Sequence, residues 1–192
     1  MRLLLRFLLG LYLTVVGVGG CAPALPPAAA GVAWQPGRYV QESYRSPDFH
    51  AEKTTYTLSS LTVEEAVGVT PEEFLPIFRE EWTRAWQAAG LKTAAAADSA
   101  GLSGTVHHLS LKGAAFRRLT GRLRGSLTIS GTITRGQEIL FAFRDRVEVS
   151  SPLAPGPAPP KEREIFLRQL ARETVYHLLN ELLLQGFTAE SG

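Results

Sequence analysis

The chain has 192 residues, and its 20 lysines and arginines slightly exceed its 18 acidic residues, which gives a formal net charge of +2. Arg2 and Arg6 account for this excess, so the rest of the chain is electrically balanced. The balance predicts no nucleic-acid partner, because nucleic-acid-binding domains concentrate basic side chains. Cys21 is the only cysteine, which excludes an internal disulfide.

The N-terminal segment has the order of residues found in a secretory signal. Arg2 and Arg6 form a basic start, which is followed by a mostly apolar stretch and then by two glycines. The uncharged run that ends at Cys21 is shorter than the ~20 apolar residues of a membrane-spanning helix. We therefore interpret residues 1–20 as a signal peptide.

The sequence Val18-Gly19-Gly20-Cys21 resembles the lipobox of bacterial lipoproteins, in which hydrophobic and small residues precede a modified cysteine. The resemblance implies cleavage before Cys21, a diacylglycerol on its sulfur and an acyl chain on its new amino group. We expect these lipids and no other cofactor. Two or three acyl chains hold a protein firmly on a membrane, whereas one chain binds reversibly.

The residue after the cysteine bears on the choice of membrane. Gram-negative lipoproteins that stay in the inner membrane carry an aspartate there, whereas this chain has Ala22. The resemblance therefore favours the outer membrane, with the protein on its periplasmic face. An uncleaved membrane anchor and an ordinary signal peptide with an incidental cysteine are the alternatives.

An alanine- and proline-rich segment, residues 21–38, follows the signal and is interpreted as a tether. Such a segment cannot build a core and favours the extended polyproline II conformation. At ~3.1 Å per residue it would lift the next domain up to about 50 Å from the membrane. We expect residues 39–192 to form a single periplasmic domain.

The sequence of the first half of this domain predicts one strand, residues 54–63, and one helix. Thr70-Pro71-Glu72-Glu73 is typical of a helix start with a capping box. Pro76 predicts a kink or a later start, and Gly90 followed by Leu91 predicts the helix end. Two tryptophans lie on this helix, and we expect one in the core and one at an interface; they are Trp82 and Trp86.

The second half predicts three further strands and a long helix. Residues 102–111 form the first of these strands, and residues 123–134 and 139–149 form a hairpin with alternating apolar positions. Matching the apolar faces places Ile133 opposite Ile139, Ile129 opposite Phe143 and Arg124 opposite Glu148. A wide apolar stripe over residues 161–185 predicts the terminal helix.

These elements predict an α+β fold in the order β-α-β-β-β-α. An antiparallel-rich sheet of about four strands would carry both helices on one face, as a two-layer sandwich. The lipobox, the tether and this order of elements resemble small Gram-negative outer-membrane lipoproteins. Among them are the auxiliary lipoproteins of ABC-type transporters and, more loosely, the lipopolysaccharide-assembly lipoprotein.

The residues with reactive side chains do not predict catalysis or metal binding. His107 and His108 are neighbours on a predicted strand and should point to opposite faces, with no third ligand at a useful spacing. Ser110 is interpreted as an ordinary strand residue. Three pairs of glutamates, at positions 64–65, 72–73 and 80–81, are interpreted as structural, since a hydrolytic dyad needs convergence in a cleft.

Asp145 interrupts the apolar face of its predicted strand. A buried carboxylate needs a partner, and Arg122, Arg144 and Arg146 are close to it in sequence. We expect instead that a bulge or a sheet edge turns Asp145 outward. His177, on the polar side of the terminal helix, is interpreted as solvated.

Arginines are concentrated around the predicted hairpin. Four of them, Arg122, Arg124, Arg144 and Arg146, form a candidate patch for anionic lipid headgroups or an acidic partner. The alternative is a solvated face with cross-strand ion pairs.

The sequence therefore predicts a non-catalytic lipoprotein, anchored in a membrane, that serves as an adaptor or auxiliary subunit in envelope assembly or lipid transport. Its expected partners are the membrane and an envelope protein. One alternative is a lipid- or glycan-binding module with an apolar pocket between the terminal helix and the sheet. A second alternative is an envelope hydrolase.

Overall fold

One mixed β-sheet of eight strands runs through the structure, a computed structural model that describes residues 32–93, 99–112, 120, 122–152 and 160–184. The strands are β1 (Gln35–Pro36), β2 (Glu42–Arg45), β3 (Thr55–Val63), β4 (Ala66–Val67), β5 (Lys92–Thr93), β6 (Ala100–Lys112), β7 (Arg124–Arg135) and β8 (Glu138–Ser150). The helices are the short 3-10 helix η1 (Ala51–Lys53) and the α-helices α2 (Pro71–Ala88) and α4 (Pro160–Leu183).

The strand order is β1-β2-β8-β7-β6-β3-β5, and β4 pairs with β6. The expected α+β class with two long helices is confirmed, but the expected simple two-layer sandwich with about four strands is wrong, because the sheet is mixed and has eight strands. β3 pairs with β6 in parallel because α2 carries the chain back between them. The extra strands β1, β2, β4 and β5 have only two to four residues, which is too short to show a period of two in the sequence.

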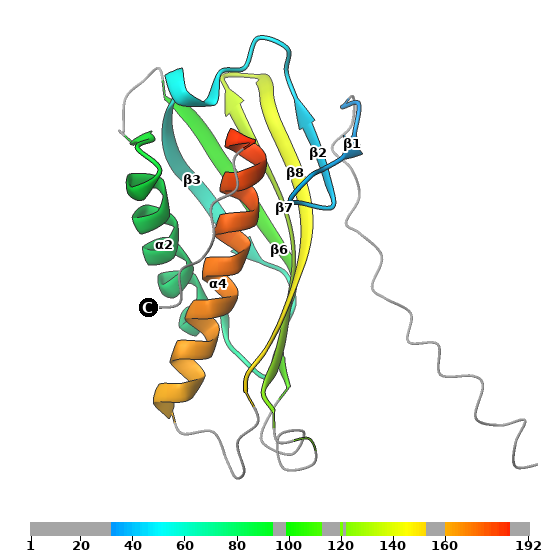
Figure 1. Cartoon of the computed structure of the whole chain (residues 1–192), viewed down its shortest axis with the longest axis vertical. Coiled ribbons are helices and arrows are strands. Elements are labelled where there is room, and N and C mark those ends of the chain that lie inside the picture. The colour runs from blue at the N-terminus through cyan, green and yellow to red at the C-terminus, as the bar shows by residue number, and fades with distance from the viewer. Residues whose placement is uncertain (1–31, 94–98, 113–119, 121, 153–159, 185–192) are drawn as a thin grey trace, which may run out of the picture.

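Both long helices cover the same face of the sheet, as Figure 1 shows. α4 packs on β7 and β8 and runs beside α2. The core between helices and sheet is apolar, and its fully buried members include Tyr56, Trp86, Ile129, Leu170 and Leu182. The other face of the sheet, called the open face here, carries serine, threonine, arginine and histidine side chains.

The start and end of α2 agree with the sequence. The hydroxyl of Thr70 accepts a hydrogen bond from the Glu73 N–H, and the Glu73 carboxylate accepts one from the Thr70 N–H at 2.8 Å, which forms the capping box. The helix runs from Pro71 through Pro76 without a later start. At its end Gly90 has a φ of +69°, and the N–H of Leu91 donates to the carbonyl of Trp86.

Trp82 and Trp86 both lie in the core, so the expectation that one of them serves an interface is wrong. Their rings stack with centroids 3.4 Å apart, and Trp86 also meets Tyr56 of β3 edge-on at 5.9 Å. α2 turns both indoles inward because they are four residues apart and therefore share one helix face.

The β7–β8 hairpin has the expected faces but a register shifted by two residues. Ile133 pairs with Phe141, Ile129 with Asp145, and Arg124 with Ser150. A two-residue turn that contains Gly136, with a φ of +61°, shifts the register by one residue. A bulge between the Thr134 and Ile133 pairs shifts the register by a second residue. A shift of two conserves the side of every residue, which is why the alternation predicted the faces correctly.

The N-terminal strands are fastened to α4 by one buried carboxylate. Glu181 accepts hydrogen bonds from the backbone N–H groups of Arg38 and Tyr39, both at 2.8 Å, and from the hydroxyl of Ser43 at 2.7 Å. Arg45 donates to the last carbonyls of α4 and lies over aromatic rings of the core. The structure thus includes Gln35 and Pro36, at the end of the expected tether, in the sheet.

Candidate functional site

The open face carries two rows of hydroxyl groups across three neighbouring strands. Registered pairing aligns Ser60, Ser103 and Thr132 in one row. It aligns Thr62, Thr105 and Ser130 in the next row, two residues further along each strand. We call these six residues the hydroxyl array. A shallow hollow of about 300 Å³ lies over the array.

Trp34 forms a wall of this hollow. It precedes β1 and reaches the open face, where the Arg144 guanidinium lies 5.0 Å from the centre of its indole ring. Arg144 in turn forms an ion pair with Glu42 on the neighbouring strand β2. Arg144 therefore serves to position Trp34 beside the array and belongs to a different part of the face from the other three arginines of the candidate patch.

A β-bulge in β6 overturns the expectation that His107 and His108 point to opposite faces. The register with β7 shifts between Val106 and His108, so His107 is an extra residue and both imidazoles reach the open face. Nδ1 of His107 lies 2.7 Å from the Glu64 carboxylate, and Nδ1 of His108 lies 2.8 Å from that of Glu65.

The first of these pairs continues to a serine. Nε2 of His107 lies 2.8 Å from Oγ of Ser130, which completes a chain from Glu64 through His107 to a hydroxyl. This is the order of groups in a serine hydrolase triad. β7 lies between β6 and β8, however, so the ladders use its backbone N–H groups and leave no oxyanion hole on that strand. The arrangement links β6 to β7 across the open face through side-chain contacts.

The basic part of the candidate patch lies at the far end of β7 and β8. Arg124 and Arg146 both donate to the Glu148 carboxylate, the former at 2.9 Å. The Arg124 hydrogen bond, together with that of Arg146, lowers the pKa of Glu148 below its ordinary value despite partial burial. Arg122, Arg124 and Glu148 border a second hollow of about 370 Å³. We call Arg122, Arg124 and Arg146 the basic end.

The cross-strand ion pair between Arg124 and Glu148 was expected, and it is present although the register is not the expected one. Diagonal neighbours on a sheet are within reach of long side chains. Two arginines share one glutamate, so the basic end retains excess positive charge. This arrangement fits both the anion-binding interpretation and the interpretation as a solvated face.

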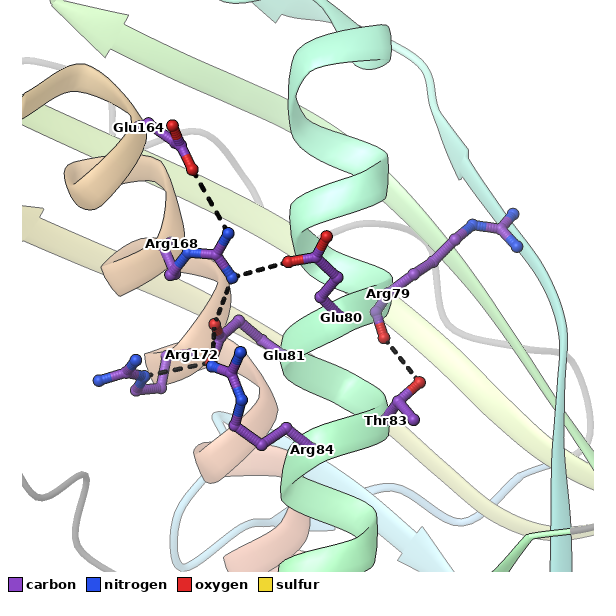
Figure 2. A network of polar contacts seen from close by, with 8 residues as sticks. All are labelled: Arg79, Glu80, Glu81, Thr83, Arg84, Glu164, Arg168 and Arg172. Atoms are coloured by element: carbon purple, nitrogen blue, oxygen red, sulfur yellow. Dashed lines mark hydrogen bonds and ion pairs between the residues drawn. The ribbon is translucent and has the colours of Figure 1, made fainter. Parts of the chain in front are cut away.

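The helix layer contains a separate charged network, shown in Figure 2. Glu81 of α2 has a side chain only 3% exposed, and its oxygens accept hydrogen bonds from Arg84, Arg168 and Arg172. Burial favours the neutral acid, but the guanidinium hydrogen bonds outweigh it and lower the pKa of Glu81. This network joins α2 to α4 and does not border either hollow on the sheet.

Asp145 is buried on the helix side of the sheet and is 4% exposed, so the expected outward turn is wrong. Its partner is His177 of α4, whose Nδ1 lies 2.8 Å from the carboxylate. None of the three arginines considered as its partner lies on that side. The same contact corrects the interpretation of His177 as a solvated residue.

The interface between α4 and the sheet is filled by side chains. Buried residues from both layers meet there, among them Phe166, Leu170, Leu127 and Val147. Both hollows lie elsewhere, so the described structure gives no support to a lipid pocket under the terminal helix. Among the residues described, no group of three or more histidine, cysteine, aspartate or glutamate side chains is placed to hold a metal ion.

Cys21 and the predicted signal peptide lie outside the described residues, as does most of the predicted tether. Within the described ranges, no helix is both long and apolar enough to cross a membrane. The lipid anchor therefore remains a prediction from the sequence.

Comparisons with known proteins show limited likeness. No family model and no curated protein matches the chain. Among solved structures, a DUF330 protein from Xanthomonas campestris is 12% identical, with 73% of this chain and 90% of that chain covered and a TM-score of 0.45.

Two solved lipoproteins also resemble this chain, with lower TM-scores. The minor lipoprotein from Acinetobacter baumannii is 14% identical, covers 67% of this chain and 93% of its own, and has a TM-score of 0.39. The rare lipoprotein B from Shewanella oneidensis is also 14% identical, with 62% and 91% covered and a TM-score of 0.38. These values assign no function to the chain.

Proposed function

We propose that this protein is a lipid-anchored, non-catalytic adaptor of the bacterial envelope, tethered through Cys21 to the periplasmic face of the outer membrane. The observation that carries the proposal is Val18-Gly19-Gly20-Cys21 behind a basic and apolar leader. Residues 1–20 would be removed, and acyl chains on Cys21 would hold the domain at the membrane.

The basic end gives this adaptor a surface for an acidic envelope partner. Arg122 and Arg124 are exposed, and Glu148 offsets only part of their charge and that of Arg146. Guanidinium groups bind carboxylates and phosphates through paired hydrogen bonds. An acidic protein surface is favoured over lipid headgroups here, because the mixed charges of the patch suit a partner that also carries both signs.

Site-specific photocrosslinking in native membranes tests this proposal. A crosslinking residue at position 122 should give a discrete protein adduct, whereas one at Arg79, an exposed arginine on the helix side, should not. Arg124→Glu combined with Arg146→Glu should weaken the adduct at position 122. Arg79→Glu combined with Lys53→Glu changes the net charge equally and should leave it intact.

Two results would contradict the adaptor surface. One is an equal adduct yield from positions 122 and 79. The other is binding of the purified chain to phosphatidylglycerol vesicles with no protein adduct, which would assign the basic end to lipid headgroups.

A further inference from the structure

The hydroxyl array and Trp34 together form a concave surface whose chemistry is distinct from that of the basic end. Neighbouring strands are about 4.8 Å apart and alternate residues on one strand about 6.7 Å apart, so the array presents hydroxyls on a regular grid. Each hydroxyl can both donate and accept a hydrogen bond. A ligand that matches this grid must itself carry many groups of both kinds.

Part of this hydrogen-bonding capacity is unused within the described chain. Ser130 is bonded to His107, and Thr62 lies 3.4 Å from Thr105. Among the described residues, the hydroxyls of Ser60, Ser103 and Thr132 have no hydrogen-bond partner. The indole nitrogen of Trp34 is shielded from solvent and has no acceptor among the described residues, which costs free energy.

Trp34 adds an apolar contact to this polar floor. The face of an aromatic ring carries negative electrostatic potential and attracts the polarised C–H bonds on the flat side of a sugar ring. Ligand sites commonly combine such an aromatic surface with a few fixed polar groups, and they begin at about 300 Å³. The hollow over the array has that volume.

The charges around the hollow favour a neutral ligand. Arg144 is paired with Glu42, and His107 is paired with Glu64. The lining side chains themselves are uncharged. A polyanion would find a better site at the basic end, where Arg124 and Arg146 share one glutamate and Arg122 is exposed nearby.

The preceding segment of the chain is a poor occupant for this site. Residues 22–31 contain only alanine, proline, leucine and glycine, so they have no side chain that could match the hydroxyls. We propose that Trp34 and the hydroxyl array bind a neutral saccharide. This inference is independent of the adaptor proposal, since the two use different parts of the open face.

Calorimetric titration with neutral oligosaccharides tests the inference. The full chain, purified from membranes in a zwitterionic detergent without a sugar headgroup, is titrated with chitotetraose and with maltotetraose. Saturable binding of at least one of them is expected, together with a change in tryptophan fluorescence. Trp34 would be its source, because Trp82 and Trp86 are buried in the core.

Variants locate the binding. Trp34→Ala should weaken the affinity about tenfold or more, whereas Trp34→Phe should keep most of it. Thr132→Val removes one hydroxyl of the array and should weaken the affinity about threefold to tenfold. Thr134→Val is the matched control, because Thr134 lies on the same strand and face but outside the hollow. Unchanged melting temperatures would confirm that each variant is folded.

Three outcomes would overturn the inference. One is the absence of binding by both neutral oligosaccharides. Another is binding that Trp34→Ala and Thr132→Val leave unchanged. The third is binding of a sulfated chitotetraose alone, which would point to an anion site. None of these outcomes would change the result expected for crosslinking at position 122, which tests the adaptor proposal.

Discussion

Asp145 of β8 and His177 of α4 are joined across the helix–sheet interface by a contact of 2.8 Å between Oδ2 and Nδ1. The hydrogen bond to Asp145 raises the pKa of His177 above its ordinary value, although burial acts in the opposite direction. The charged imidazole therefore stabilises the fold below its ordinary pKa. This contribution is lost as the pH rises through the raised pKa of the folded state.

His177→Gln should accordingly lower the free energy of unfolding more at about pH 5.5 than at about pH 9. The side chain is 37% exposed, so solvent screening limits the effect to about 1 kcal/mol or less. Urea unfolding at both pH values measures it, and Asp145→Asn should remove the same pH dependence. A loss that is equal at the two pH values would contradict this account of the pair.

Glu81→Gln should destabilise the protein by about 2 kcal/mol or more, because it leaves arginines of the helix layer without their buried partner. Glu80→Gln is the matched control: its carboxylate is 58% exposed and also accepts from Arg168, and its loss should be below about 1 kcal/mol. Since the pKa of Glu81 is lowered, its contribution should disappear as the pH falls through that lowered value. Urea unfolding measures the free energy of unfolding of both variants. An equal loss of this free energy for Glu81→Gln and Glu80→Gln would contradict the prediction.

Gly131→Ala should destabilise the sheet by about 1–3 kcal/mol. A Cβ atom there would lie 2.5 Å from the Phe143 ring and 2.9 Å from the Ser103 carbonyl. Gly104→Ala is a milder change, because the nearest atom would be a Leu61 methyl group at 3.1 Å. In thermal unfolding, the melting temperature of Gly131→Ala should be well below that of Gly104→Ala. The reverse order would contradict this account of the packing.

A fluorophosphonate probe for activated serines should not label the purified chain. The Ser130 hydroxyl has a histidine and a carboxylate behind it, but the β7 ladder leaves no N–H group on that strand to stabilise an oxyanion. Mass spectrometry of the treated protein checks this expectation. Labelling that Ser130→Ala abolishes would revive the hydrolase alternative.

The sequence predicted those features that depend on local chemistry. The capping box at Thr70 and the helix end at Gly90 each depend on only a few neighbouring residues, and both are present. The two faces of the β7–β8 hairpin were also predictable, because a period of two survives a register shift of two residues.

Features that depend on long-range pairing were not predictable. Asp145 was expected outside because its partner, His177, lies 32 residues away on another element. The bulge that brings His107 and His108 to one face leaves no signal in a single sequence. Trp34 was missed because it lies within the expected tether. The only signal in the sequence was the presence of a tryptophan in a segment of mostly small residues.

The central claim is that Cys21 anchors this domain to a membrane, and metabolic labelling with an acyl-chain analogue tests it most directly. The wild-type chain should incorporate the label, and Cys21→Ser should not, because it removes the sulfur that carries the lipid. Label in both chains, or in neither, would contradict the claim.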